Sequence, residues 1–536
     1  MVRIEVTRRA AALGAAALGL GAATGAHGAS AWSAGEVAHL IPTAGPNALL
    51  IVASLKSAVA EASLFVGERE VPGNRTDSAG RHWRFHADKL RPGTTYTLRL
   101  AHADRPLCDP WALRTLPDPD AAEPHFRLLA FTCAGGWEGL KMADGTPAFR
   151  PLALRRRLLA RGLSFSPDAV VAIGDHVYWD LTSWKERSSG GAPPPTLDKN
   201  GPFGAFDMDL PIYGTPNEEV VRRIGEAQIG ALYGTMLKGV PSYFVADDHD
   251  YFDNDVANAA HITFPPETFN VNAQRTTAAL FYPPLLGSAL RPAILPGGAD
   301  EIAPGANDCF GTLRWGRLCE ALIYDCARFL TLKGPFAGLV PPEAERWLLA
   351  RTQTSDARAL LHIPSHPMGW SAGKWREWYP DILADSKPGV PAHLTTEVEK
   401  YFWQKGWNAQ HQRLLAALAA RGGASAVVSG DLHAVGWGRI RKSYDLDLGA
   451  GVTTVLSGPI STDGPGFPST FRGVSPQVPD GLVIAEPPPA EKNGFAIVDV
   501  VPGSLTFRLF AWRDPDPVDA IDTLEPFDVV TVPVAG

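Results

Sequence analysis

The sequence lacks several features that would assign a protein to a class directly. Its five cysteines include no Cys-x-x-Cys spacing, which excludes a zinc site built from paired thiolates, and their odd number leaves at least one thiol unpaired. It has no excess of basic charge, since the formal net charge is -8, and we expect no nucleic-acid-binding surface. The 53 glycines and 47 prolines among 536 residues predict many turns and long connections rather than a helical bundle.

The N-terminal segment is predicted to direct export. Its apolar run, residues 10–26, is too short and too rich in alanine and glycine to predict a membrane span. The pair Arg8-Arg9 before this run resembles a twin-arginine signal, and Ala29-Ser30-Ala31 fits signal-peptide cleavage. We therefore expect residues 1–31 to be a signal read by the twin-arginine export machinery, and the mature chain to be periplasmic or extracellular without a membrane span. A disordered basic tail is the alternative.

The next segment, residues 36–117, predicts a β-sandwich. Short alternating apolar runs are separated by clusters of turn residues, as in domains built from many short strands. The stretch from Leu90 to Tyr96 resembles the tyrosine corner of fibronectin type III domains. A proline-rich linker from Leu116 to Pro124 then precedes the predicted catalytic domain, residues 125–536.

Predicted strands and helices alternate in the second domain. The predicted strands are 126–133, 168–174, 241–247, 320–326, 358–364, 425–430, 452–457, 494–501 and 504–511. The predicted helices are 151–161, 217–237, 342–352 and 407–421. This order predicts a mixed α and β architecture.

Several of these strands end in residues that bind metals. The segments 168–180, 241–250 and 425–434 read DAVVAIGDHVYWD, PSYFVADDHD and SAVVSGDLHA, each an apolar run that ends in aspartate and histidine. A fourth strand ends at Cys133 and is followed by glycines, although a buried, inert cysteine is the alternative there. Strand ends commonly carry the sites of α/β enzymes. We therefore predict that these segments form the walls of one metal site.

The ordered motifs FTC, GDHVYWD, DDHD and SGDLH resemble those of the PhoD-like alkaline phosphatases, within the calcineurin-like metallophosphoesterase superfamily. The resemblance covers the chain from about Val37 to the C-terminus. It implies an α+β fold, namely a four-layer αββα metallophosphoesterase sandwich with an N-terminal fibronectin III-like β-sandwich domain. It also implies a two-metal centre that hydrolyses phosphate esters.

The resemblance also implies metal ligands. Asp175 is expected to bridge the two metals, with Cys133 in place of the first aspartate motif and Tyr178 on the same metal. The other expected ligands are Asp248 in place of an asparagine, Asp431 in place of a histidine, His433, and His366 as the candidate for the remaining histidine. Thiolate, phenolate and imidazole together suit ferric iron. The oxygen-rich side suits Ca²⁺, with Mg²⁺ or Mn²⁺ as alternatives, and Asp180 or Asn254 are further candidate donors there.

Catalytic and substrate-binding residues are expected beside these ligands. By the resemblance His249 holds the catalytic position over the substrate, and Asp250 next to it is expected to orient its ring. The stretch HPMGWSAGKWREW interleaves Lys374 and Arg376 with tryptophans that include Trp370. These three side chains predict a pocket wall for an organic phosphate, with a place in the core as the alternative.

The expected function is that of an exported phosphoesterase. It would cleave phosphate mono- or diesters by attack of a metal-bound hydroxide, without a covalent intermediate. One alternative is a phospholipase D-like phosphodiesterase, for which the partner is a phospholipid headgroup rather than a small phosphate ester. The other is a binding or scaffold protein whose metal site is only structural, which the retention of Asp175, His249 and His433 argues against.

Overall fold

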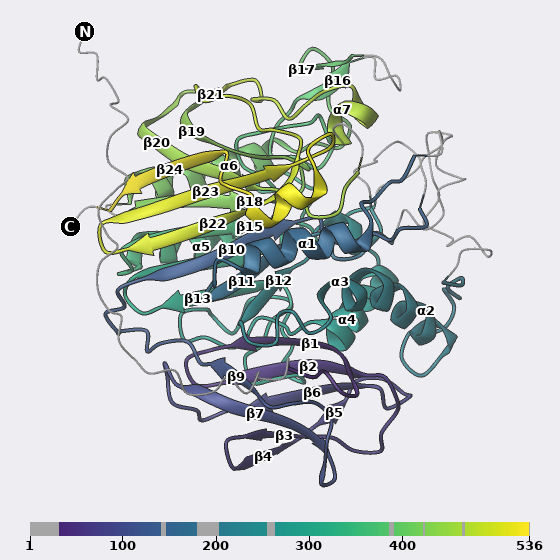
Figure 1. Cartoon of the computed structure of the whole chain (residues 1–536). Coiled ribbons are helices and arrows are strands. Elements are labelled where there is room, and N and C mark those ends of the chain that lie inside the picture. The colour runs from purple at the N-terminus through teal and green to yellow at the C-terminus, as the bar shows by residue number, and fades with distance from the viewer. Residues whose placement is uncertain are drawn as a thin grey trace. The chain divides into compact units, whose positions relative to one another are not determined.

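The computed structural model of the protein describes residues 32–140, 146–179, 203–253, 263–384, 391–421, 424–463 and 467–534. The predicted signal peptide lies outside these ranges, as do Asp180 and Asn254. Residues Ala34–Gly536 form one compact unit (Figure 1). Within the described ranges, no helix combines the length and the apolar character that crossing a membrane requires.

The first strands of this unit form two antiparallel sheets. One contains β1 (Val37–Ala44), β2 (Leu49–Leu55), β6 (His82–Ala87) and β5 (Asn74–Arg75), in this order. The other contains β4 (Arg69–Pro72), β3 (Ser63–Val66), β7 (Thr95–His102) and β8 (Arg105–Pro106), and β9 (Trp111–Arg114) also pairs with β7. Tyr96 Oη accepts a hydrogen bond from Arg91 N at 2.9 Å, the type of contact that defines a tyrosine corner. The likeness to fibronectin type III domains itself stays a prediction.

These two sheets are joined to the rest of the unit by buried polar contacts. Leu40 N on β1 donates to Gly234 O at 2.9 Å, and Tyr243 Oη on β12 donates to Ala44 O at 2.7 Å. The predicted domain boundaries at residues 117 and 125 stay predictions, because one compact unit contains both sides.

The second part of the chain contains a mixed six-stranded sheet. Its order is β12 (Ser242–Val245), β11 (Ala169–Ile173), β10 (Phe126–Thr132), β22 (Asn493–Val501), β23 (Ser504–Trp512) and β24 (Asp528–Pro533). The first three strands are parallel, and β22 to β24 continue the sheet antiparallel. All five residues of β11 are buried, which explains its uninterrupted apolar sequence.

A mixed seven-stranded sheet lies against it. Its order is β13 (Phe310–Trp315), β14 (Cys319–Tyr324), β15 (Ala359–Pro364), β18 (Ala424–Ser429), β20 (Leu446–Ser457), β19 (Val435–Ser443) and β21 (Leu482–Ile484). Strands β14, β15, β18 and β20 are parallel. The two sheets contact each other through β19 and β20 on one side and β22 and β23 on the other. A short hairpin, β16 (Ile382–Ala384) and β17 (His393–Thr395), completes the strands of the described ranges.

Helices cover the outer face of each sheet (Figure 1). The apolar core beside the six-stranded sheet contains α1 (Leu152–Leu163), α2 (Pro216–Gly225), the π-helix η2 (Glu226–Gly230), α3 (Ala231–Tyr233) and α4 (Thr268–Phe281). Of these, α4 also contacts β1, β2 and β6 of the first antiparallel sheet. On the seven-stranded sheet the helices are α5 (Pro342–Thr354) and α6 (Lys405–Ala420). Short helices are η3 (Asp248–Tyr251), α7 (Phe467–Arg472) and η4 (Val518–Thr523). The described elements therefore lie in the order helices, sheet, sheet, helices.

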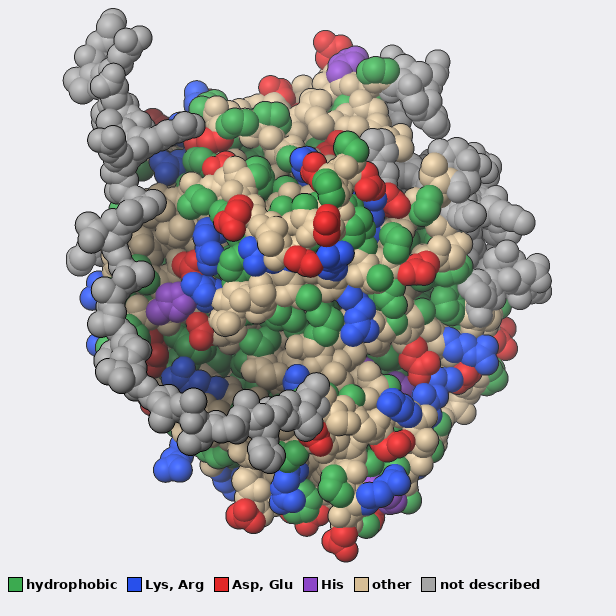
Figure 2. Space-filling view, viewed as in Figure 1, with side chains coloured by type: hydrophobic (Ala, Val, Ile, Leu, Met, Phe, Trp, Pro, Cys, Tyr) green, Lys and Arg blue, Asp and Glu red, His purple; other side chains and the backbone are tan. Residues whose placement is uncertain are grey.

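The visible surface carries no dominant charge of one sign. On the face in Figure 2, the described Lys and Arg side chains are interspersed with Asp and Glu. Helix α2 illustrates the local rules for such charges: Thr215 caps it by accepting from Asn217 N at 3.2 Å, acidic residues occupy its first turn, and arginines occupy its last.

Candidate metal centre

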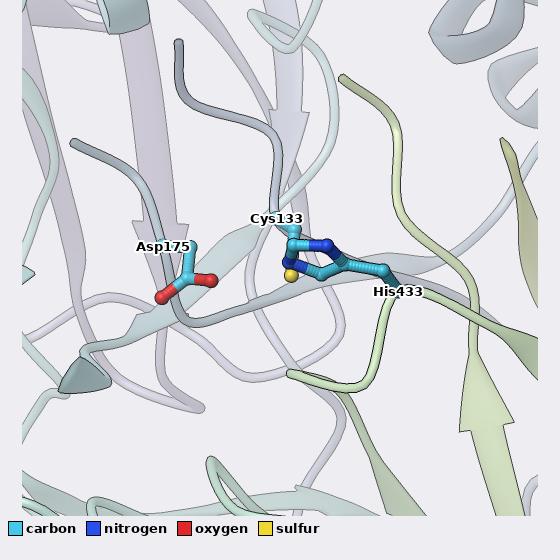
Figure 3. Close-up of side chains that lie close together, drawn as sticks. All are labelled: Cys133, Asp175 and His433. Atoms are coloured by element: carbon cyan, nitrogen blue, oxygen red, sulfur yellow. The ribbon is translucent and has the colours of Figure 1, made fainter. Parts of the chain in front are cut away.

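The parallel strands of both sheets end at a common edge, and the predicted ligands lie there. Cys133 follows β10, Asp175 follows β11, and His433 lies in the loop after β18 (Figure 3). Three groups of potential ligands are present among the described residues, each with its donor atoms within 4.8 Å of one another. The groups are Cys133–Asp175–His433, Asp175–Asp248–His249 and Asp247–His366–Asp431. Every member is buried, and Asp175 belongs to two groups, as a bridging ligand would.

Close approach of the strand ends depends on glycines and on one hydroxyl group. A Cβ on Gly430 would lie 2.1 Å from Thr132 Oγ1, and a Cβ on Gly174, at φ 67°, would lie 2.6 Å from Asp247 Cβ. Thr132 Oγ1 donates to Ile173 O at 2.5 Å and accepts from Asp431 N at 3.1 Å. One threonine therefore connects β10, the end of β11 and the loop after β18.

Four of the predicted ligands have left-handed backbone conformations. The φ angles are 48° at Cys133, 57° at Asp175, 68° at Asp431 and 50° at His433. This conformation is uncommon for residues other than glycine, because Cβ crowds the following carbonyl group, and it concentrates at functional sites. Its recurrence at the ends of three strands indicates that the fold holds these side chains in place at a cost in stability.

Tyr178 lies beside the first group. Its hydroxyl donates to Asp175 Oδ2 at 3.2 Å, and its ring centroid is 4.2 Å from that of His249. Burial raises the pKa of both the Tyr178 phenol and the Cys133 thiol well above their usual values, and the charge of Asp175 adds to both shifts. Both groups therefore keep their protons in the bare protein, and metal binding would have to displace these protons.

The residues fit a metal centre on two further observations. Asp175 Oδ1 and Asp247 Oδ2 are both buried, and neither has a hydrogen-bond partner among the described residues. Burial raises the pKa of Asp247 to about 8, although the charge of Arg376 opposes this shift. Buried carboxylates crowded together in this way require cations or protons. Sulfur, phenol, imidazole and carboxylate donors on one side, and carboxylates with imidazole on the other, are a donor set for two unlike metals.

The carboxylate of Asp250 connects the ends of two strands. It accepts hydrogen bonds from the backbone N atoms of residues 175, 176, 177 and 247, at 2.9 to 3.0 Å. These contacts attach it to the loop that carries Asp175 and to the end of β12. The predicted role of Asp250 in orienting the ring of His249 stays a prediction.

Lys374 and Arg376, two residues of the predicted pocket wall, form ion pairs with buried carboxylates of the site. Lys374 Nζ lies 2.5 Å from Asp431 Oδ1, and Arg376 Nη2 lies 2.9 Å from Asp247 Oδ1 and 3.7 Å from Asp248 Oδ1. Trp370 is 1% exposed and packs among Ala372, Leu432 and other apolar residues. The two cations therefore contact carboxylates of candidate ligands, and Trp370 lies in the core, as the alternative stated.

Two residues of the site were missed in the sequence. Asp247 has the character of a turn cap, and it does cap η3, but its Oδ2 has no hydrogen-bond partner among the described residues and lies 4.0 Å from His366 Nδ1, within the third group. Gln228 comes from the helix η2, and its side chain accepts hydrogen bonds from two loops of the centre. In contrast, His176 within the GDHVYWD motif lies in the core, where Nε2 contacts Val245 O at 3.0 Å and burial lowers its pKa to about 4.

Solved structures of two phosphatases share this architecture. That of PhoD matches with a TM-score of 0.55 over 89% of this chain and 87% of that chain, at 14% identity. That of the purple acid phosphatase PPD1 from yellow lupin (Lupinus luteus) seeds matches with a TM-score of 0.53 over 92% of this chain and 73% of that chain, at 11% identity. The chain has the fold of these two phosphatases. No family model and no curated protein matches the sequence.

This shared fold accounts for the position of the candidate centre. The two sheets contribute candidate ligands from opposite sides: Cys133, Asp175 and Asp248 follow strands of the six-stranded sheet, whereas His366 and Asp431 follow strands of the other sheet. The resemblance predicted from the four motifs is thereby confirmed in the fold.

Proposed function

We propose that the protein is a metal-dependent phosphoesterase that hydrolyses phosphate mono- or diesters. The observation that carries this proposal is the set of three buried ligand groups, joined through Asp175, at the edge where the parallel strands of a metallophosphoesterase fold end. When bound, a pair of metals would supply Lewis acidity toward phosphate oxygens and toward water.

The first group, with Tyr178, would hold a ferric ion, because thiol, phenol, carboxyl and imidazole donors converge there. The second metal would be Ca²⁺, with Mg²⁺ or Mn²⁺ as alternatives, and its donors would be Asp175, Asp248, Asp431 and His366. Asp247 lies within reach of the same space.

His249 is the residue proposed to transfer a proton. One of its ring nitrogens lies within 4.8 Å of carboxylate oxygens of Asp175 and Asp248, and its ring packs against Tyr178. A histidine held there would donate its proton to the leaving oxygen of the ester. Export through the twin-arginine route is proposed from Arg8-Arg9 and the run that follows, and it would deliver a folded, metal-loaded chain.

The test is to purify the exported protein, determine its metals, and assay a phosphomonoester and a phosphodiester chromogen in parallel. We expect two bound metals per chain, and a loss of turnover of about 10²–10⁴-fold for His249→Ala. Cys133→Ala should lose the first metal together with activity. Its matched control is Cys319→Ala, since Cys319 is a buried thiol in β14 outside the three ligand groups.

The ratio of the two activities decides between a phosphomonoesterase and a phosphodiesterase, including an enzyme that acts on phospholipid headgroups. Bound metal without turnover of either ester would contradict the proposal and leave a metal-binding protein.

A further inference from the structure

The side chain of Gln228 connects two loops of the metal centre. Its Oε1 accepts a hydrogen bond from Gly136 N at 2.6 Å and another from Tyr178 N at 2.9 Å. Gly136 belongs to the loop that follows Cys133, and Tyr178 belongs to the loop that follows Asp175. Gln228 is completely buried, so neither backbone donor can exchange this acceptor for water.

The orientation of this amide follows from its partners. Both groups that contact it are backbone N–H donors, so the atom that faces them has to be the carbonyl oxygen and not the nitrogen. Its Nε2 is buried without a hydrogen-bond partner among the described residues. Such an unsatisfied donor costs free energy, and the side chain is held there despite that cost.

A π-helix brings Gln228 to this position. Helix α2 changes into η2, where Ala231 N donates to Glu226 O, five residues before it, and then continues as α3. The wider turn keeps Gln228 on the same buried face of the helix as Ile224 and Leu232. Single π turns within α-helices occur frequently at functional sites.

A second buried side chain fixes the same loop. Arg155 on α1 donates from Nη1 to Gly136 O at 2.8 Å and to Gly135 O at 3.2 Å. Gly136 therefore has its N–H held by Gln228 and its carbonyl held by Arg155. In contrast, the backbone of Tyr178 is held by Gln228 and not by Arg155.

We infer that Gln228 is a positioning residue for the first metal. By holding Gly136 and Tyr178 on one oxygen atom, it fixes the separation of the loops that carry the thiol and the phenol. This inference rests on the metal centre of the proposed function. It assigns the amide a role in metal affinity and ligand geometry rather than contact with substrate.

The test uses Co²⁺ alone as the probe, added to the full-length protein after its metals have been removed. Thiolate-to-cobalt absorption reports on coordination by Cys133. Gln228→Leu should weaken Co²⁺ binding by about 10- to 100-fold, the range typical of residues that orient metal ligands, and should change the absorption band. Gln228→Glu keeps an acceptor oxygen and should restore both affinity and spectrum.

The matched control is Gln274→Leu. Gln274 is also a buried helical glutamine, and its Nε2 donates to Tyr282 Oη at 3.3 Å outside the centre. The Gln274→Leu variant should leave Co²⁺ binding unchanged, even where it lowers the thermal stability as much as Gln228→Leu does. If Gln228→Leu is not obtained folded, Gln228→Asn, whose shorter side chain does not reach both N–H groups, should show the same loss.

Wild-type affinity and an unchanged band in Gln228→Leu or in Gln228→Asn would overturn the inference. The readout does not involve turnover. A wild-type protein that binds Co²⁺ through Cys133 but cleaves neither ester would refute the proposed function, while the comparison of variants would still decide the role of Gln228.

Discussion

The carboxylate of Asp250 holds the backbone amide of Asp175 at 2.9 Å. The same carboxylate accepts from three further backbone amides, at residues 176, 177 and 247. It thereby fixes the left-handed turn that carries the candidate bridging ligand and joins the ends of β11 and β12. A carboxylate adjacent to His249 in the sequence thus acts on the scaffold of the site.

Replacing Asp250 tests this arrangement. Asp250→Asn places an amide group where one oxygen accepts from two N–H groups, so we expect the metal-free protein to lose about 2–4 kcal/mol of unfolding free energy. Denaturant unfolding measures the loss. Asp118→Asn is the control, since exposed Asp118 accepts from the single backbone N of Asp120 and should change stability very little. Equal stability of both variants would contradict the role given to Asp250.

The left-handed backbone at Cys133 predicts that glycine is more stabilising than alanine there, the reverse of their usual order. At φ 48° the alanine Cβ is strained, so Cys133→Gly should be more stable than Cys133→Ala by about 1 kcal/mol, while both lose the first metal. At Cys319, in strand β14, the order should be the ordinary one, with alanine favoured by roughly 0.5–1 kcal/mol. Thermal unfolding of the four variants without metal measures this, and alanine favoured at both positions would refute it.

The ion pair of Lys374 with Asp431 predicts a coupling between stability and metal. Lys374→Met leaves a buried carboxylate without its cation, so we expect the metal-free protein to lose about 3 kcal/mol. Saturating Ca²⁺ should reduce the loss, because a bound cation neutralises Asp431. Lys492→Met is the control, since Lys492 pairs with Asp516 at 3.9 Å on the surface. A loss that is the same with and without Ca²⁺ would contradict this reading.

His362 predicts the pH dependence of stability. Thr352 Oγ1 donates to Leu348 O, so it accepts from His362 Nε2 at 2.9 Å, and His362 Nδ1 accepts from Tyr324 Oη at 3.2 Å. The ring is thus buried in its neutral form. Burial, with a smaller contribution from the charge of Arg421, lowers its pKa from 6.5 to about 3.

The unfolded chain therefore binds more protons than the folded chain between pH 3 and 6.5. The contribution of His362 is complete above pH 6.5 and is lost as the pH falls, by up to about 1.4 kcal/mol per pH unit. His362→Gln should flatten the fall in unfolding free energy between pH 6 and 4, whereas His393→Gln, at an exposed position, should leave it unchanged. An unchanged slope in His362→Gln would show that the ring is not buried neutral.

Much of the fold was accessible from the sequence because buried parallel strands are continuous apolar runs. All nine predicted strands are present, with ends that differ by a few residues, and β11 is the clearest example. Helix α4 was missed, because TFNVNAQRTTAALF contains three threonines, two asparagines and a valine, which have low helix propensity, and no side chain caps its N-terminus. Strand β19 was missed as well, because glycines and charges interrupt its apolar residues.

The candidate site was accessible only where its residues form local motifs. Cys133, Asp175 and His433 follow strands directly, and the strand-end pattern brings them together. Gln228 lies 92 residues from Gly136 and binds backbone amides, which leave no trace in a sequence. The charges of Lys374 and Arg376 were noted correctly, but the sequence carries no sign of whether a cation faces a ligand carboxylate or a substrate.

The ligand groups also have a consequence for the order of folding. The first group joins Cys133 to His433, residues supplied by different sheets and separated by most of the central chain. A nascent chain that has not yet paired β18 within its sheet cannot close this group, however complete the earlier strands are. Under the proposed function, capture of the first ion would therefore be a late event, and it would mark the moment at which both sheets have assembled.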